Sequence, residues 1–273
     1  MPITIQAALL GVVQGLTEFL PVSSSAHLIL ARAVFGFDGD KFGLTFDVAC
    51  HVGTLIAVVI YFRREVGEMI AALPYLFRPG SQSERSAQAR LIWLLAAGTI
   101  PAIVVGLLFK NQIEEHMRTP VVAAVALALG GIMLLVAERA GSRTRGERTL
   151  TMIEAVWIGC AQALALVPGV SRSGATLTVA LLIGLRRADA ARFIFLLAIP
   201  AILGAAASEA PRLLKAGLGD TASLFLIGIV ASAIVGYATV KYFIRYLGNH
   251  SLDMFGWYRI ALAAAVAIWL LRP

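Results

Sequence analysis

The sequence predicts an all-α polytopic membrane protein with six transmembrane helices and two re-entrant helical hairpins, arranged as two inverted repeats. Three observations lead to this fold class. The 273 residues are 59% apolar and 14% charged, with a mean hydropathy of +0.83, whereas a soluble domain is about half apolar and a quarter charged. Six apolar stretches have the length of a membrane span. Two further apolar stretches are broken near their middle and match each other.

A spanning helix needs roughly 20 mostly apolar residues. The segments that meet this requirement are about 44–62, 91–109, 120–138, 192–209, 222–240 and 254–271. The apolar stretches 3–34 and 152–185 are too long for one helix, and Pro, Gly and Ser break each of them. Because lipid does not tolerate the backbone groups that a break leaves unpaired, we expect re-entrant hairpins that are buried in protein or line a wet cavity.

Loop arginines indicate which ends of the spans face the cytoplasm. They are Arg63, Arg64, Arg78, Arg85 and Arg90 in loop 63–90, and Arg139, Arg143, Arg145 and Arg148 in loop 139–150. Two spans separate these loops, so both can be cytoplasmic, as the positive-inside rule requires. If 152–185 is a hairpin, the arginines of "LRRADAAR" at 185–192 also return to the cytoplasm. A spanning segment would place them outside, so the hairpin is favoured.

A shift of 148 residues superimposes the two broken stretches. The matched pairs are Gly11 and Gly159, Gln14 and Gln162, Leu16 and Leu164, Val22 and Val170, Ser23 and Ser171, and Ser25 and Ser173. The sequence thus divides into repeat one, about 1–138, and repeat two, about 152–271, joined by a basic cytoplasmic loop of about 139–150 within one integral membrane domain. Each repeat has one hairpin and three spans, and this odd number inverts the second repeat. Such inverted repeats are typical of secondary transporters, which makes a transporter the first functional hypothesis.

The first break carries polar groups in an apolar surround. Gln14 and Glu18 are neighbours on one helix face, and a carboxylate beside an amide can hold a hard cation when phosphate and water oxygens complete its shell. The other polar side chains are Ser23, Ser24, Ser25 and His27. An ionisable group at membrane depth is functional by default, whereas Ser25 is more simply a residue that bonds across to a neighbouring helix.

The second break resembles a phosphate-binding turn. Arg172 follows Pro168 and Gly169 and stands at a helix start, where an arginine fork, hydroxyl groups and backbone N–H groups can all contact an anion. The hydroxyl groups are those of Ser171, Ser173 and Thr176. A metal-competent acid, an anion clamp, hydroxyl nucleophiles and a histidine together favour phosphoryl transfer over the transport of a neutral solute. Nucleic-acid binding is excluded, because the chain has no soluble basic domain.

With these residues in view, the chain resembles the undecaprenyl-diphosphate phosphatase family, also called the bacitracin-resistance proteins. The motifs that carry the resemblance are "QGLTEFLPVSSSAH" at 14–27, "PGVSRSGAT" at 168–176, "FLLAIP" at 195–200 and "YRI" at 258–260. The resemblance implies an inner-membrane enzyme that removes the terminal phosphate of the C55 isoprenyl diphosphate, recycles the carrier lipid of peptidoglycan synthesis and opens toward the periplasm. It also implies a divalent cation, Mg or Ca, and a homodimer.

The family pattern also assigns roles to individual residues. Glu18 takes the place of the acidic metal ligand, and Gln14 occupies a position where many members have Glu. Ser24 and His27 match the catalytic serine and histidine, and Arg172 matches the arginine that clamps phosphate. The residues that match the rest of the phosphate site are Ser23, Ser171, Ser173 and Thr176.

Two assignments remain open in the sequence. Either Ser24 attacks phosphorus with His27 as its base, or His27 is itself the nucleophile. The alternative function is a flippase or transporter of undecaprenyl phosphate, built on the same inverted repeat.

Overall fold

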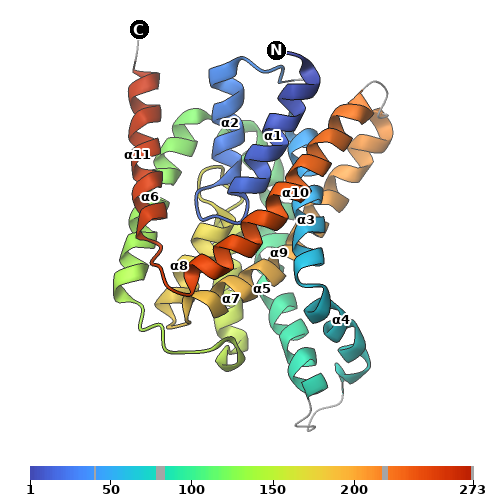
Figure 1. Cartoon of the computed structure of the whole chain (residues 1–273), viewed down its shortest axis with the longest axis vertical. Coiled ribbons are helices and arrows are strands. Elements are labelled where there is room, and N and C mark those ends of the chain that lie inside the picture. The colour runs from blue at the N-terminus through green and yellow to red at the C-terminus, as the bar shows by residue number, and fades with distance from the viewer. Residues whose placement is uncertain (40, 78–83, 217–220, 272–273) are drawn as a thin grey trace.

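The computed structural model describes residues 1–39, 41–77, 84–216 and 221–271, and this part of the chain is helical apart from its loops (Figure 1). Arg78, one of the predicted loop arginines, lies outside the described residues. The α-helices are α1 (Ile3–Thr17), α2 (Ser24–Phe35), α3 (Leu44–Tyr61), α4 (Arg63–Ala72), α5 (Glu84–Gln112), α6 (Pro120–Ala140), α7 (Met152–Leu164), α8 (Arg172–Leu182), α9 (Arg187–Ala216), α10 (Ala222–Leu247) and α11 (Asp253–Leu270). Short helical turns cover Leu73–Tyr75, Ile113–Met117 and Glu147–Thr149.

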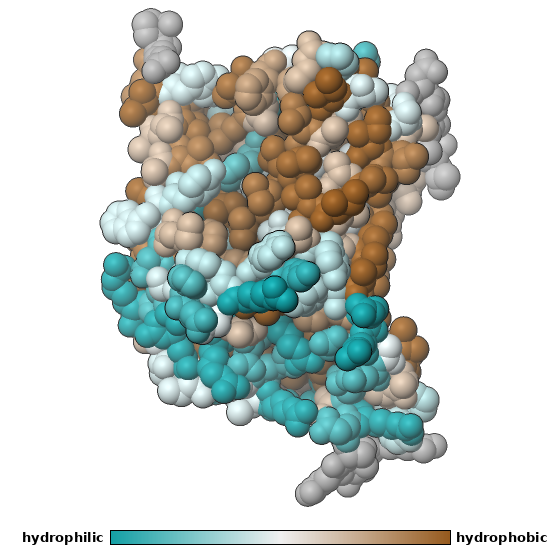
Figure 2. Space-filling view, in the orientation of Figure 1, coloured by the Kyte–Doolittle hydropathy of each residue, from teal (hydrophilic) through white to brown (hydrophobic). Residues whose placement is uncertain are grey.

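Six of the described helices are long and apolar enough to cross a membrane, namely α3, α5, α6, α9, α10 and α11. They coincide with the six predicted spans, so the multi-pass, all-α fold class is confirmed. Figure 2 shows the same division on the surface, with hydrophobic residues over the upper part of the molecule and hydrophilic residues over its lower end. Several loop arginines belong to that hydrophilic lower end.

Both broken stretches form two helices joined by a short irregular turn. α1 and α2 flank the first turn, and α7 and α8 flank the second. Ser23 and Ser171 adopt the same unusual backbone, with φ of 73° and 70°. Each caps the helix that follows, Ser23 by accepting from the N–H of Ala26 at 3.4 Å and Ser171 by accepting from that of Gly174 at 3.1 Å. The two turns thus share one local structure at matched positions.

The first short helix of each pair packs on a long helix from the other half of the chain. α1 lies against α10, and α7 lies against α5. A Cβ on Gly11 would come within 2.7 Å of the backbone oxygen of Gly228, and a Cβ on the matched Gly159 would overlap the backbone of Gly98. Small residues let helices approach this closely in membranes. In both halves a short helix packs on a long helix of the other half, which agrees with a repeat. The re-entrant topology and the inversion stay predictions.

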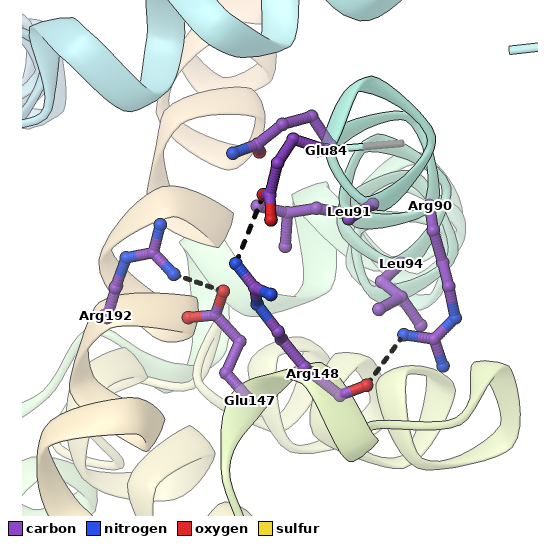
Figure 3. Close-up of a pocket in the computed structure, with 9 residues that line it drawn as sticks. Glu84, Arg90, Leu91, Leu94, Glu147, Arg148 and Arg192 are labelled. Atoms are coloured by element: carbon purple, nitrogen blue, oxygen red, sulfur yellow. Dashed lines mark hydrogen bonds and ion pairs between the residues drawn. The ribbon is translucent and has the colours of Figure 1, made fainter. Parts of the chain in front are cut away.

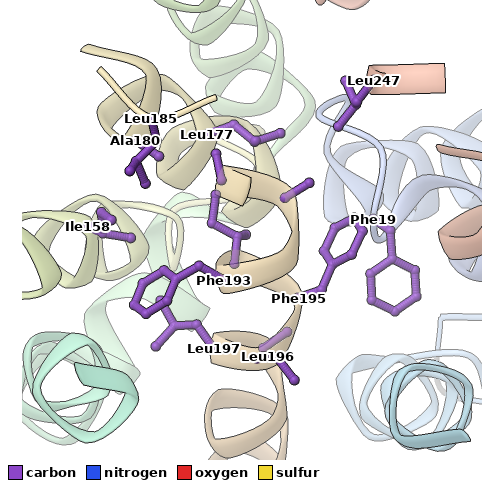
Figure 4. Packing of buried hydrophobic residues seen from close by; sticks show 14 of the residues in the cluster. Phe19, Ile158, Leu177, Ala180, Leu185, Phe193, Phe195, Leu196, Leu197 and Leu247 are labelled. Atoms are coloured by element: carbon purple, nitrogen blue, oxygen red, sulfur yellow. The ribbon is translucent and has the colours of Figure 1, made fainter. Parts of the chain in front are cut away.

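The largest buried apolar cluster surrounds α9 and holds the first turn in place. Figure 4 shows Phe19, Phe193 and Phe195 within it, together with leucines from several helices. The rings of Phe19 and Phe195 meet edge to face, with centroids 5.2 Å apart. Because Phe19 directly follows Glu18, this packing fixes the chain where the polar residues of the first turn begin.

Loop 141–151 between the halves is folded onto the helix ends. Glu138, at the end of α6, is buried and accepts from Arg143 at 2.7 Å, from Arg187 and from the N–H of Leu252 at 3.2 Å. These contacts tie the loop to the starts of α9 and α11. The predicted basic loop is therefore an ordered connection among charged groups.

Candidate active site

The two turns meet at a cavity of about 650 Å³. The first turn contributes Glu18 and the three serines, and the second contributes Ser171 and Arg172. Other polar lining residues include His51, Thr99, Gln162, Ser208 and Glu209. Apolar side chains of α3, α5 and α9 complete the wall, among them Val48, Ile103, Leu107 and Ile202. The predicted convergence of the two turns is thus present in the structure.

Three hydrogen-bond donors and the imidazole of His51 surround the buried carboxylate of Glu18. Its Oε2 accepts from Gln14 Nε2 at 2.8 Å and from Ser24 Oγ at 2.7 Å, and His51 Nε2 lies 3.3 Å away. Its Oε1 accepts from the guanidinium of Arg172. Removing one partner from such a buried pair leaves a charge uncompensated and is strongly unfavourable. Glu18 therefore links the first turn, the second turn and α3 at one point.

Ser24 is the first residue of α2 and its hydroxyl lies on the cavity wall. The cap formed by Ser23 fixes the start of α2 and so directs the Ser24 side chain. Its hydroxyl donates to a carboxylate oxygen, which is the arrangement needed to remove the proton of an attacking serine. The base in reach of Ser24 in this geometry is Glu18.

Both ring nitrogens of His27 have partners other than Ser24. Its Nδ1 lies 2.7 Å from the carbonyl oxygen of Ser23, which can only accept, so Nδ1 carries the proton. Its Nε2 lies 2.7 Å from the hydroxyl of Tyr258, which donates to it, and the two rings stack with centroids 5.7 Å apart. The predicted pairing of Ser24 with His27 is not found among these contacts. The roles of both residues in catalysis stay predictions.

The second turn divides into one ligand-facing part and one structural part. Arg172 and Ser171 line the cavity. Ser173 instead donates to the carbonyl oxygen of Leu20 at 2.8 Å, and Thr176 donates to that of Arg172 at 2.6 Å. Ser25 likewise accepts from the N–H of Gly169 at 3.4 Å. Ser173 and Ser25 therefore join the two turns, as expected for Ser25.

His51 and Tyr258 are not among the site residues that the sequence predicts. His51 belongs to the α3 span, and its Nδ1 donates to the backbone oxygen of Asp47 at 2.7 Å, which turns Nε2 toward Glu18. A histidine inside a predicted span is itself a signal of function, so His51 could have been found. Tyr258 belongs to the "YRI" motif at 258–260, but that motif did not indicate a contact with His27, which lies 231 positions away.

The predicted cation site has one suitable feature. Gln14 Oε1 is buried and has no hydrogen-bond partner, and it belongs to the side chain that contacts Glu18. In the described part of the chain no group of three or more His, Cys, Asp or Glu residues could hold a metal. Gln14 and Glu18 therefore fit a cation only if substrate phosphate and water supply most of its oxygen ligands.

A second, smaller cavity of about 180 Å³ lies among the loop arginines (Figure 3). Arg192 pairs with Glu147, Arg148 pairs with Glu84, and Arg90 donates to backbone oxygens of the loop. Burial raises the pKa of Glu147 despite the arginine beside it. The described lining of this cavity contains no serine or histidine.

Known proteins resemble this chain over almost its whole length. The family model described as "Bacitracin resistance protein BacA" matches residues 7–265. The chain is 48% identical to an undecaprenyl-diphosphatase of Rubrobacter xylanophilus over 268 residues, which cover 98% of each protein. It is 42% identical to an undecaprenyl-diphosphatase of Moorella thermoacetica, over 98% of this chain and 99% of the relative. It is also 45% identical to undecaprenyl-diphosphatase 2 of Stutzerimonas stutzeri, over 97% of each protein.

Proposed function

This chain belongs to the bacitracin resistance protein family, and from that premise we propose how its two turns carry out the reaction. The chain is an undecaprenyl-diphosphatase that hydrolyses undecaprenyl diphosphate to undecaprenyl phosphate and inorganic phosphate. The reaction recycles the lipid carrier of peptidoglycan synthesis. The observation that supports our assignment of roles is the contact of 2.7 Å between Ser24 Oγ and Glu18 Oε2, on a carboxylate that also accepts from Arg172.

Ser24 is the nucleophile in this proposal and Glu18 accepts its proton. Ser24 Oγ forms a bond to the terminal phosphorus while the bridging P–O bond breaks, and undecaprenyl phosphate leaves with the electron pair. Water then attacks the phosphoserine, Ser24 Oγ recovers its proton and inorganic phosphate is released. His27 orients the turn through the backbone oxygen of Ser23. The rival proposal, with His27 as nucleophile, requires its Nε2 to leave the hydroxyl of Tyr258.

Arg172 supplies positive charge where charge develops on the transferred phosphoryl group. One part of its guanidinium contacts Glu18, and its other N–H groups are available to non-bridging oxygens on the cavity side. Ser23 and Ser171 lie on the cavity wall as further polar contacts. A divalent cation, Mg or Ca, would be held by Gln14 and Glu18 and would neutralise charge on the diphosphate when bound.

The lipid tail would lie along the apolar wall formed by α5 and α9. We further propose that the cavity opens toward the periplasm of the bacterial inner membrane. Its lining includes Asn111, Gln112 and Arg118, which belong to the end of the molecule that the positive-inside rule places outside. A homodimer is implied by the family and would be tested by cross-linking in membranes.

A flippase of undecaprenyl phosphate is not proposed. The relatives are named for hydrolysis, and the contact of Ser24 Oγ with the Glu18 carboxylate has a role in phosphoryl transfer. Hydrolysis in detergent, where there is no second compartment, separates the two functions.

The test is release of phosphate from undecaprenyl diphosphate by the purified protein in detergent, with and without Mg or Ca. We expect Ser24→Ala, Glu18→Gln and Arg172→Met each to lower kcat by about 10³-fold or more, while Cys160→Ser, at an exposed position outside the cavity, stays within a few-fold of wild type. Gln14→Met should raise the cation concentration that gives half-maximal activity. Acid-stable phosphoenzyme from labelled substrate would support Ser24, acid-labile phosphoenzyme would support His27, and no release by folded wild type would refute the assignment.

A further inference from the structure

Arg259 is the largest completely buried side chain of the described residues. It belongs to α11, a membrane-spanning helix, and among the described ion pairs it has no carboxylate partner. Burying an unpaired charge in a protein interior costs several kcal/mol, on the order of the effective penalty per buried ion. An arginine in such a position needs a specific structural reason.

The guanidinium donates to five backbone carbonyl oxygens. Two belong to α6, those of Ala126 at 3.2 Å and Leu127 at 3.3 Å. The other three belong to the two turns, Pro21 at 3.3 Å, Gly169 at 3.1 Å and Val170 at 2.8 Å. Pro21 and Gly169 are 148 residues apart, so one side chain binds the same position of both repeats.

The surrounding backbone leaves room for this guanidinium. A Cβ on Gly130 of α6 would overlap Arg259 Nη2, and a Cβ on Gly174 of α8 would overlap Nη1. The room is therefore provided by two separate helices. The hydroxyl of Tyr258, the preceding residue, lies 2.7 Å from His27 Nε2. Two consecutive residues of α11 therefore contact the residues of the two turns.

The residues that follow the bound carbonyls are those that line the cavity. Ser23 and Ser24 come directly after Pro21 and Val22, and Ser171 and Arg172 come directly after Val170. The distance between Ser24 and Arg172 depends on how the two turns are held against each other. A displacement of about 1 Å can cost about 10²-fold in rate.

We propose that Arg259 is a positioning residue that fixes the two turns in the register needed for catalysis, an inference that rests on the proposed function. Arg259 does not line the cavity and acts through Pro21, Gly169 and Val170. A purely structural role would lower stability but leave the folded molecules fully active. The positioning role predicts a loss of turnover in molecules that are folded.

The kinetic test compares Arg259→Lys and Arg259→Met with Arg245→Met, an exposed arginine at the end of α10. Lysine keeps the charge but has three donors in place of the planar fork of arginine. We expect kcat to fall about 10²-fold in Arg259→Met, with a smaller loss in Arg259→Lys and KM within a few-fold of wild type. Arg245→Met should match wild type, and thermal unfolding checks that each variant is folded.

A second variant covers the case in which Arg259→Met does not fold. Gly130→Ala leaves both turns and the charge intact but occupies the space of Nη2. It should lower kcat in the same way, while Gly67→Ala, where a Cβ would meet open space, should not.

A measurement independent of activity uses spin labels at Leu16→Cys and Leu164→Cys, both exposed and at matched positions, with Cys160 replaced by Ser. Arg259→Met should broaden the distance distribution between the labels. Wild-type kcat in folded variants, or an unchanged distribution, would overturn the positioning role. If wild type itself releases no phosphate, the proposed function fails, and the label distances still test whether Arg259 holds the turns together.

Discussion

At the scale of single residues, Glu18 is the group around which the site is organised. Its two oxygens accept from Gln14, Ser24 and Arg172, and His51 lies 3.3 Å from Oε2. Because each partner comes from a different direction, the carboxylate has little freedom to rotate. The residue that can accept a proton from Ser24 is therefore held in place before substrate binds.

The contact between His51 and Glu18 leads to a prediction about turnover. His51→Leu removes the imidazole that lies against Glu18, and we expect kcat to fall about ten-fold or more because the carboxylate can then turn away from Ser24. His51→Gln should retain most of the activity, since its amide can still donate. Phosphate release measured against His250→Leu, an exposed histidine, checks this. Equal rates for His51→Leu and wild type would refute it.

At the scale of elements, the start of α7 shows how the second hairpin is attached to the loop before it. Thr151 and Glu154 form a capping box, and Arg145 contacts Glu154 through both terminal nitrogens, at 2.6 and 3.0 Å. The hydrogen bonds from Arg145 lower the pKa of Glu154 from 4.5 to about 2. The ionised carboxylate thus stabilises the first turn of the helix.

This lowered pKa predicts how stability depends on pH. A carboxyl group whose folded pKa is below its unfolded value stabilises the fold above the unfolded pKa, here 4.5, and loses that effect as the pH falls toward about 2. We expect Glu154→Gln to lower the melting temperature at pH 6, and the difference from wild type to shrink as the pH falls below 4.5. A difference that grew on acidification would contradict this sign. Glu68→Gln, on exposed α4, is the control.

At the scale of the whole molecule, each hairpin packs against the other half of the chain. α1 contacts α10, α7 contacts α5, and Arg259 of α11 binds both turns. Neither half contains the complete site, because Glu18 and Arg172 lie on different hairpins. The two halves must therefore fold together for the enzyme to work.

The hairpin topology predicts which positions lie on the same side of the membrane. Single cysteines at Gln6 and Gly39 should both react with a membrane-impermeant maleimide added outside intact cells. Cysteines at Arg148 and Arg186 should react only after permeabilisation. Gln6 lies near the start of α1 and Gly39 follows α2, while Arg148 and Arg186 flank α7 and α8. Cys160 is replaced by Ser in every variant, and the native Cys50 is buried. Opposite labelling within either pair would show that the segment between them spans the membrane.

The sequence by itself determined the spans, the two breaks and the polar residues of both turns. Hydrophobic length and helix-breaking residues are local properties, so the six spans could be predicted to within about five residues, apart from the earlier start of α5 at Glu84 and the later ends of α9 at Ala216 and α10 at Leu247. The match between Ser23 and Ser171 could also be read directly, and their shared backbone conformation follows from it.

Only the tertiary structure decided which polar groups meet. It paired Ser24 with Glu18, and paired His27 with Tyr258, 231 residues away. It also brought His51 to Glu18 and placed Arg259 between the turns. Such contacts depend on how helices distant in sequence pack, and no periodicity or spacing along the chain encodes them.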